Sequence, residues 1–474
     1  MNRSSHPHRP LSAVAVITSI VASVLVFVAP VNAVTIRPFT SRFQANINGA
    51  IDIFGNTLQT CPTSATCTAA QNGTANNNNN SFTMIAVDAD GLATTTNSSM
   101  TTVSYPASAT VRFAGMYWGA SGGAVAGQPN ILFRRPGDGT TYSPIVASRT
   151  DTGNGTYQSF ANVTAQVAAA GPGQYWAANA AMAPGGGSHA GWSLVVVWED
   201  SSQPLRNLTV FDGYGQVTTA SAADAVLNIP VSGFLAPPFG AVRAEVGVIT
   251  YEGDSNTNGD GLFLDTTPDG NTTLNATDGV ALRNPDGVGG LGGTCTPVTQ
   301  SQCNAFNSTI TTGGVNDAAT AGAMNPAYRN TLGYDADEID ATGLLPNSAT
   351  QLELTLTTSG DFYYPGVITT AIDLYSPTFP TQTKTVTNLT RGTDPALPGD
   401  VLEYNLTVSN VGLDPSDNTS LVDVLPANTT YVSGSLAVTS GANTGSKTDG
   451  SGDDQAEYNA GTRAVSYQIG RAHV

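Results

Sequence analysis

The sequence predicts an all-β protein, with a large β-sandwich-type head followed by an immunoglobulin-like β-sandwich repeat. Apolar residues recur at every second position in segments such as residues 242–248, the spacing of a strand that buries one face. The run SLVVVW at residues 193–198 is apolar throughout, which is typical of a strand buried on both faces. Turn sequences such as Pro-Gly-Asp-Gly at residues 136–139 separate such segments. Only residues 164–170 have a helical pattern, so strands dominate the prediction.

Residues 1–33 have the pattern of a secretory signal peptide. Arg3 and Arg9 precede an uninterrupted apolar run at residues 11–29, and small residues at 31–33 suit a cleavage site. An uncleaved N-terminal membrane anchor is the alternative, because the run is long enough to span a bilayer. We expect a secreted protein that is extracellular or held at the cell surface, with no transmembrane span in the mature chain.

The chain is strongly acidic, with a formal net charge of −18. After the predicted signal peptide it contains two lysines, Lys384 and Lys447. Such a surface offers few cations to replace the counterions of nucleic acid or anionic lipid, so we expect no nucleic-acid partner. The acidity favours either solubility alone or the binding of cations. The expected partner is the cell envelope or an extracellular ligand, either a glycan or a protein.

Four cysteines form two close pairs in the sequence. Cys61 is near Cys67, and Cys295 is near Cys303. An even number of cysteines in an exported chain predicts two local disulfides. A zinc site is disfavoured, because no CxxC motif occurs.

The head is predicted to span residues 34–375. Its length suits one large sandwich or two packed sandwiches that divide near Pro237 and Pro238. The Asn-rich segment at residues 68–81 has little apolar surface to bury and is predicted to be a mobile loop. The Pro- and Thr-containing segment at residues 376–383 is predicted to be a short, stiff linker.

Residues 254–265 (DSNTNGDGLFLD) match the ligand spacing of a calcium loop. Oxygen-bearing side chains occupy loop positions 1, 3, 5, 7 and 12, with a glycine at position 6. The last position is Asp rather than Glu and no helices flank the loop, so a polar hairpin loop is the alternative. A second acidic group at residues 335–340 suits either cation binding or a solvated loop. Calcium is the one cofactor suggested, with the expected ligands Asp254, Asn256, Asn258, Asp260 and Asp265.

The sequence offers no convincing catalytic motif. Residues 119–123 match the G-x-S-x-G pattern around Ser121, and His189 is available as a base. A nucleophile elbow needs a helix after the serine, and the Gly- and Pro-containing residues 124–130 do not predict one. No pair of carboxylates forms a glycosidase signature. We therefore expect a protein that is not an enzyme.

The C-terminal module begins with a turn at residues 398–400 that feeds a strand. In this strand Leu402, Tyr404, Leu406 and Val408 are expected to face inward. A second strand is expected to begin at Val422 and a third at Tyr431–Val432. Strands of this length and spacing predict an immunoglobulin-like sandwich.

Residues 384–468 resemble the bacterial surface conserved-repeat family, the domain of unknown function eleven. The resemblance is carried by Pro398-Gly399-Asp400, Tyr404, Val408-Ser409-Asn410 with Gly412, and Asp423-Val424-Leu425-Pro426. It implies a tandem stalk module of secreted or surface proteins, without known catalytic residues. Segments such as FAGMYWG at residues 113–119 are similar to the head regions that precede these repeats.

Residues 469–474 match one reading frame of a sequencing adapter, so we expect them to be a non-native tail and the repeat to be truncated. The leading functional hypothesis is a bacterial cell-surface-associated protein with a structural or adhesive role, its head displayed on sandwich repeats. The alternative is an extracellular carbohydrate-binding or carbohydrate-active protein. The four tryptophans give little support to the alternative, because they lie within predicted strands and are expected to be mostly core.

Overall fold

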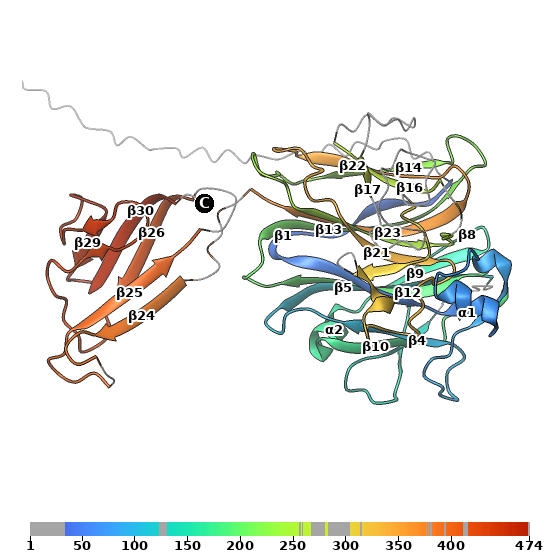
Figure 1. Cartoon of the computed structure of the whole chain (residues 1–474), viewed down its shortest axis with the longest axis horizontal. Coiled ribbons are helices and arrows are strands. Elements are labelled where there is room, and N and C mark those ends of the chain that lie inside the picture. Colours follow the sequence, from blue (N-terminus) through green and yellow to red (C-terminus); the bar gives the residue numbers. More distant parts are fainter. Residues whose placement is uncertain are drawn as a thin grey trace, which may run out of the picture.

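The computed structural model describes residues 34–122, 130–255, 257, 259–266, 280–282, 304–312, 315–375, 377, 379, 382–392, 395–410 and 416–472. The predicted signal peptide and the predicted Cys295–Cys303 disulfide lie outside these residues. Figure 1 shows a large head and a smaller C-terminal module. Within the described residues no helix is long and apolar enough to cross a membrane.

The prediction of an all-β protein is confirmed. The described residues contain two short α-helices, α1 (Ala65–Gln71) and α2 (Thr164–Ala170), and two 3₁₀ turns, η1 (Asn79–Ser81) and η3 (Asp317–Ala319). Helix α2 coincides with the predicted helical segment, and α1 was not predicted.

Four layers of β-sheet stack face to face in the head, the middle two formed by one 11-stranded sheet, and we number them 1 to 4 (Figure 1). Layer 1 contains, in order, β20 (Met324–Asn325), β4 (Ser98–Val103), β10 (Gly173–Ala178), β6 (Ile131–Arg134) and β7 (Ser143–Ile145). Layer 2 contains β8 (Arg149–Gly153), β9 (Thr156–Asn162), β5 (Thr110–Ser121), β12 (Ala190–Glu199) and the second half of β1 (Val34–Thr57). Layer 3 contains the first half of β1, then β13 (Leu205–Thr218), β23 (Phe362–Asp373), β15 (Ala244–Tyr251), β21 (Tyr334–Asp340), β18 (Ile310–Thr312) and β19 (Val315–Asn316). Layer 4 contains β14 (Val226–Ser232), β22 (Gln351–Thr357), β16 (Gly261–Asp265) and β17 (Val280–Leu282). A small sheet adds β11 (Gly185–Gly186), β3 (Thr83–Ala86) and β2 (Gln59–Thr60).

The long strand β1 joins the two middle layers. Residues 34–48 pair with β13 in layer 3, whereas residues 49–57 pair with β12 in layer 2. One continuous strand therefore belongs to both layers, and the two layers turn their faces toward each other.

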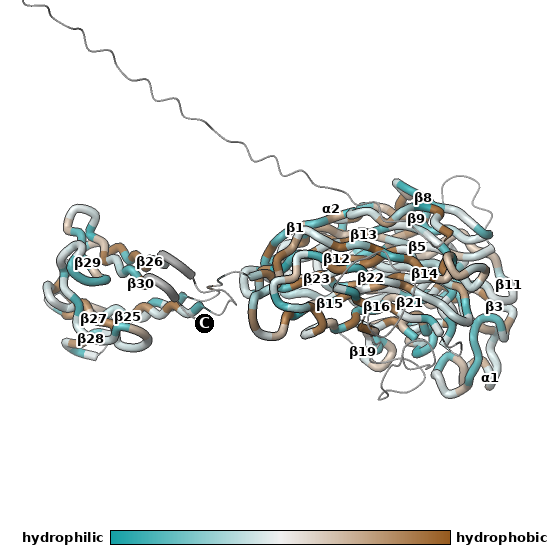
Figure 2. The backbone as a smooth tube through the Cα atoms, turned by 90° about the horizontal axis from the view of Figure 1, so that it is seen from above, coloured by the Kyte–Doolittle hydropathy of each residue, from teal (hydrophilic) through white to brown (hydrophobic). Residues whose placement is uncertain are grey.

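Three hydrophobic cores fill the spaces between the four layers, and Figure 2 shows hydrophobic stretches concentrated in the strands of the head. Strand β12 shows the arrangement most clearly. Leu194 and Val196 pack between layers 1 and 2, while Val195 and Val197 pack between layers 2 and 3. Both faces of this strand are buried, as its uninterrupted apolar sequence predicts. Each large apolar side chain buried in this way contributes about 1.5–3 kcal/mol to folding.

The head is thus two packed sandwiches, layers 1 and 2 against layers 3 and 4. Pro237 and Pro238 lie between β14 and β15, which both belong to the second sandwich. The chain instead passes from the first sandwich to the second between β12 and β13. Strand β20 later returns to pair with β4 in layer 1, so the two sandwiches are interleaved in sequence.

The C-terminal module consists of small antiparallel sheets. Their strands are β24 (Gln382–Asn388) with β25 (Leu402–Val408), then β26 (Ser416–Val424), β30 (Ala464–Ala472) and β29 (Ala456–Asn459) in that order, and β27 (Ala437–Val438) with β28 (Gly445–Ser446). Strand β30 pairs with β26 as far as Ala472, so residues 469–472, expected to be a non-native tail, lie within a paired strand.

The predicted alternation along β25 is present. Its four apolar residues are half-buried, and the polar residues between them are exposed. The expected third strand at Tyr431–Val432 is wrong, because these residues have no strand structure. The Tyr431 ring instead stacks on Tyr458, with centroids 4.0 Å apart.

The Asn-rich segment, predicted to be a mobile loop, contains regular structure. It includes part of α1 and all of η1, and Asn79 is fully buried. Its side chains are amides, which can pack against polar groups of the head where an apolar segment could not. The reason lies in the acidic cluster described next.

Candidate metal centre

Three carboxylates meet where the chain passes from layer 3 to layer 4, and a fourth, Asp260, lies on the same connecting loop. Strand β15 ends at Tyr251 and β16 begins at Gly261, so the connecting loop carries Glu252, Asp254 and Asp260. Asp361 directly precedes β23. One ligand oxygen from each of Glu252, Asp254 and Asp361 lies within 4.8 Å of the others. We call these three residues and Asp260 the acidic cluster.

Three of the four carboxylates are buried, and several oxygens of the cluster have no hydrogen-bond partner. Glu252, Asp254 and Asp260 are each at most 2% exposed. Oε2 of Glu252, Oδ1 of Asp254, Oδ2 of Asp361 and both Asp260 oxygens accept no hydrogen bond. The Thr358 hydroxyl, which is near Asp260, donates instead to the Asp361 carbonyl oxygen at 3.0 Å. No ion pair among the described residues includes a carboxylate of the cluster.

Burial and mutual repulsion make these groups hard to ionise. Burial, with the charges of Asp254 and Asp361, raises the pKa of Glu252 to about 10. Burial and the Asp361 charge raise the pKa of Asp254 to about 8 and hold that of Asp260 well above its usual range. Burial also raises the pKa of Asp361 to about 6. Buried carboxylates are normally paired or bound to a metal, so a cation would remove the cause of these shifts.

The backbone at Glu252 is strained. Its φ of +78° is in the left-handed region, which glutamate rarely adopts. Residues held in this region cost about 1–3 kcal/mol and persist where the surrounding structure requires them. Here the unusual turn occurs at a residue that supplies a carboxylate to the cluster.

The Asn-rich segment covers one side of the cluster. The side-chain amides of Asn78 and Asn80 donate to Asp254 Oδ2 at 2.6 and 3.1 Å. Asn79 Oδ1 is a further buried oxygen without a hydrogen-bond partner. The Asn304 amide donates to the Asp254 carbonyl oxygen at 3.0 Å. Amide oxygens are good ligands for hard cations, and an amide group can present either its nitrogen or its oxygen.

The structure brings together some of the predicted ligands. Asp254 and Asp260 lie in the cluster, whereas Asn256 and Asn258 lie outside the described residues. Asp265 is at the opposite end of β16, opposite Glu353. Because an extended strand rises about 3.3 Å per residue, it cannot reach back to the loop.

Asp361, which is outside the twelve-residue pattern, lies in the cluster with Glu252 and Asp254. It was missed because it lies a hundred residues downstream, beside an adjacent strand, and no local spacing connects it to the loop. Glu252 was missed because it precedes the twelve-residue pattern; its position just before an Asp-rich loop was the available signal.

The second acidic group belongs to a strand and not to a loop, and it is buried except at Asp340. Residues 335–340 belong to β21, and Asp335 is fully buried. Asp335 Oδ1 accepts from the backbone N–H groups of Ser308 and Thr309, at 2.5 and 3.2 Å. These bonds explain its burial without a metal ion, although burial raises its pKa to about 7.

Ser121 and His189 do not form a catalytic pair. The backbone N–H of His189 donates to Ser121 Oγ at 2.9 Å, and neither ring nitrogen has a hydrogen-bond partner. The glycine of the motif, Gly119, has a packing role instead. A Cβ atom there would stand 2.8 Å from the ring of Tyr251 in layer 3.

One of the two predicted disulfides is present among the described residues. Cys61 and Cys67 are bonded and buried, and the bond fixes the start of α1 next to β2. A disulfide is compatible with secretion.

Comparisons with known proteins give only distant similarity. No protein-family profile matches the chain, and no curated protein matches it. Among solved structures, the chain is similar to the major capsid protein P2 of bacteriophage PM2, with 10% identity, a TM-score of 0.18 and coverage of 68% of this chain and 98% of that one. It is also similar to PNGF-II, with 9% identity, a TM-score of 0.19 and coverage of 58% and 59%. A third match is peptide:N-glycanase F, with 11% identity, a TM-score of 0.18 and coverage of 68% and 96%. Scores this low carry no functional argument.

Proposed function

We propose that this protein is a secreted, cell-surface-associated protein whose head is a calcium-bound double sandwich with a structural or adhesive role. The observation that supports this function is the acidic cluster, where buried carboxylate oxygens converge without partners. An extracellular head that must stay folded while exposed gains most from such a site, because a bound ion stabilises the folded state alone.

The ligand set favours calcium. All its charged members are carboxylates, with amide oxygens nearby and no His or Cys in the group. Oxygen ligands suit hard cations, whereas zinc and copper favour nitrogen and sulfur. Magnesium usually keeps several waters, but calcium accepts six to eight oxygens from a flexible protein site.

A bound ion would connect three parts of the head. Asp254 and Asp260 come from the loop between layers 3 and 4, Asp361 from the start of β23, and Asn78 from the Asn-rich segment. The role proposed for calcium is therefore to fix loops at one end of the second sandwich.

The C-terminal module is consistent with a head that is displayed on sandwich repeats. The half-buried alternation of β25 and the antiparallel pairing of its strands fit a small sandwich of the kind found in stalks, and its sequence resembles the conserved-repeat family. The predicted linker lies between β23 and β24 except for its last two residues, which belong to β24. In this proposal the module holds the head away from the surface that carries it.

Thermal unfolding of the full chain with calcium and with a chelator tests the metal centre. We expect a higher midpoint with calcium, corresponding to about 2.7 kcal/mol when the ion is present at a hundred times its Kd. Asp260→Asn should lower the calcium affinity by at least about tenfold, since charged ligands set the strength of such sites.

Asp317→Asn is a matched control for Asp260→Asn. Asp317 is also buried, with its pKa raised by burial to about 6, but its carboxylate accepts from Thr312 and lies outside the cluster. Its variant should keep the calcium response of the wild type. An unchanged midpoint in calcium and chelator would reject the proposed metal centre.

A screen of the full chain on immobilised glycans and on polysaccharide substrates tests the adhesive role against the alternative. Binding without turnover agrees with adhesion or carbohydrate binding. Turnover that is abolished by substitution of a single carboxylate would instead establish a carbohydrate-active enzyme.

A further inference from the structure

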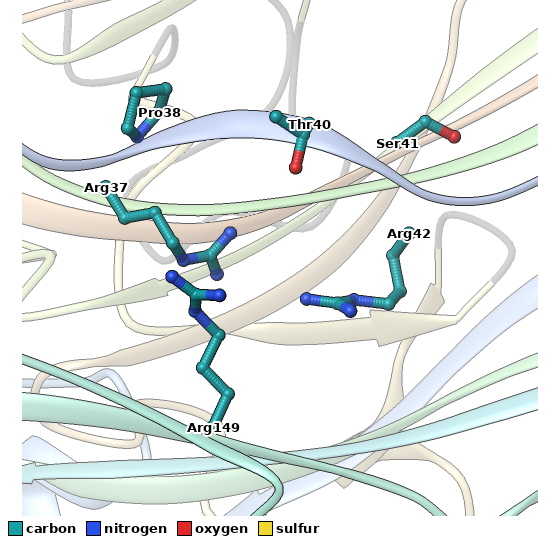
Figure 3. A pocket seen from close by; sticks show the side chains of 6 residues that line it. All are labelled: Arg37, Pro38, Thr40, Ser41, Arg42 and Arg149. Carbon is teal, nitrogen blue, oxygen red and sulfur yellow. The ribbon is translucent and has the colours of Figure 1, made fainter.

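Three arginines line one pocket of this acidic protein. The pocket has a volume of about 360 Å³ and is lined by Arg37, Pro38, Thr40, Ser41, Arg42 and Arg149. Small-molecule sites commonly have volumes of about 300 to 1,000 Å³. Figure 3 shows the three guanidinium groups pointing toward one another beneath the β1 backbone.

The pocket lies between the two sandwiches. Arg37 and Arg42 come from the first half of β1 in layer 3, and Arg149 begins β8 at the edge of layer 2. Ligand sites occur preferentially at such boundaries between packed units.

Irregular backbone shapes the pocket. The pairing of β1 with β13 shifts register between Thr35 and Arg37, between Arg37 and Thr40, and between Ser41 and Phe43. Such bulges redirect side chains and are frequent next to functional sites. They place arginine side chains and exposed hydroxyls around the same cavity.

The pocket has a surplus of positive charge. Arg37 donates to Asp151 Oδ2 at 2.8 Å and to Asp212 Oδ1 at 2.9 Å. Arg42 binds both oxygens of Asp212, at 2.7 and 3.1 Å, and Arg149 donates to Asp151 Oδ1 at 3.2 Å. Three guanidinium groups thus meet two carboxylates, which leaves one positive charge without a partner.

The arginines keep donors free for a ligand. Within the described residues, Nη2 of Arg37, Nη1 of Arg42 and both Nη atoms of Arg149 make no hydrogen bond. The Arg149 side chain is 49% exposed and that of Arg42 is 30% exposed, so both can meet a ligand. The two aspartates hold the arginine forks in place, since Asp212 is fully buried.

Free guanidinium donors and a surplus positive charge suit an anionic ligand. The other residues that line the pocket indicate which chemical group carries the negative charge. The hydroxyls of Thr40 and Ser41 are exposed and make no hydrogen bond within the described chain, and Pro38 adds an apolar surface. Guanidinium groups pair with planar carboxylates, hydroxyls pair with sugar hydroxyls, and an apolar surface suits the face of a sugar ring.

We propose that this pocket binds a uronic-acid-type sugar, with its carboxylate on Arg42 and Arg149 and its hydroxyls on Thr40 and Ser41. The single surplus charge matches one carboxylate. The proposal is independent of the acidic cluster, so either site can fail without affecting the other.

Calorimetric titration of the full chain compares three probes: D-galacturonate, D-galactose and inorganic sulfate. About 0.15 M salt screens the long-range repulsion between the acidic protein and an anion. We expect galacturonate to bind saturably and at least about tenfold more tightly than galactose, because the charged hydrogen bonds are lost with the carboxylate. We also expect it to bind more tightly than sulfate, which has no sugar hydroxyls.

Two arginine variants locate the site. Arg149→Gln should weaken galacturonate binding by about tenfold or more. Arg243→Gln is the matched control, because Arg243 is also exposed and pairs at 3.1 Å with a buried carboxylate, Asp373, that keeps a second arginine. Arg243→Gln should bind like the wild type. Thr40→Val should weaken galacturonate binding and leave sulfate binding unchanged.

Three results would overturn the proposal. Equal affinity for galacturonate and galactose would exclude recognition of the carboxylate. Equal affinity for galacturonate and sulfate would exclude recognition of the sugar. Binding that Arg149→Gln leaves intact, with an unchanged circular dichroism spectrum, would place the ligand elsewhere. The probe comparison on the wild-type protein decides the first two points even if a variant does not fold.

Discussion

The side-chain amide of Asn78 donates a hydrogen bond to Asp254 Oδ2 at 2.6 Å, joining positions that lie 176 residues apart in the sequence. The contact connects a polar, Asn-rich segment to a buried carboxylate. It explains how a segment with almost no apolar surface becomes ordered. The same contact makes this segment part of the wall of the acidic cluster.

Asn78→Ala should detach the Asn-rich segment from the head. A typical intramolecular hydrogen bond contributes about 0.5–1.5 kcal/mol, so we expect a loss of stability of this size and faster amide exchange at residues 72–81. Hydrogen-exchange mass spectrometry measures the second effect. Thr74→Ala is the control in the same segment, because the Thr74 hydroxyl contacts only the Ala69 carbonyl oxygen. Equal exchange in both variants would contradict the anchoring role of Asn78.

The sequence predicts a helix or a strand well where the spacing of apolar residues along one segment determines which face is buried. Residues 164–170 form α2 as predicted, and the alternation in β25 matches its exposure. It does not predict the order of the layers, which depends on pairings between distant strands. The two halves of strand β1 pair with different strands, and no local sequence pattern in β1 predicts this.

The same distinction holds for the candidate site. Asp254 and Asp260 could be predicted because loop spacing is local. Asp361 and Asn78 could not, since only the tertiary fold brings them to the loop. The Asn-rich segment was predicted to be a mobile loop because it has little apolar surface to bury. Its composition does not show that its side-chain amides bind a buried carboxylate, Asp254.

Gly191→Ala should destabilise the contact between layers 2 and 3. A Cβ atom at Gly191 would stand 2.3 Å from Cγ of the Tyr334 ring, which is itself fully buried. Overpacking of this kind costs about 1–3 kcal/mol. Equilibrium urea unfolding should show a lower midpoint for this variant. Gly186→Ala is the control, because its nearest neighbour would lie 3.9 Å away; similar losses in both variants would argue against close packing at Tyr334.

His189 should make the fold sensitive to mild acid. Its ring is buried beside Tyr251 and Tyr364, and burial lowers its pKa to about 3. Below about pH 6.5 the histidine of the unfolded chain takes up a proton, whereas His189 of the folded chain stays neutral. The free energy of unfolding therefore has its full value, as far as His189 is concerned, above pH 6.5, and it falls as the pH drops toward 3. The slope approaches about 1.4 kcal/mol per pH unit.

The comparison of wild type with His189→Gln isolates this effect. Carboxylates with raised pKa values change stability in the opposite direction, but they are present in both proteins. Denaturant unfolding at pH 7, 6, 5 and 4 should show the difference in stability between the two proteins changing in favour of the variant. A difference that is constant over this range would mean that His189 is not neutral in the folded protein.

The Cys61–Cys67 disulfide should support the metal centre from a distance. It closes a loop of six residues in sequence separation, and α1 leads from it directly toward Asn78. Loop-closure entropy gives such a short bridge a stabilising effect of about 2 kcal/mol. The double substitution Cys61→Ser and Cys67→Ser should therefore lower stability by about this amount. It should also weaken calcium binding, because α1 and the Asn-rich segment lose their fixed starting point.

Calorimetric calcium titration and urea unfolding measure the two effects separately. Loss of stability with unchanged calcium affinity would show that the bridge holds α1 alone and that Asn78 reaches Asp254 without its help.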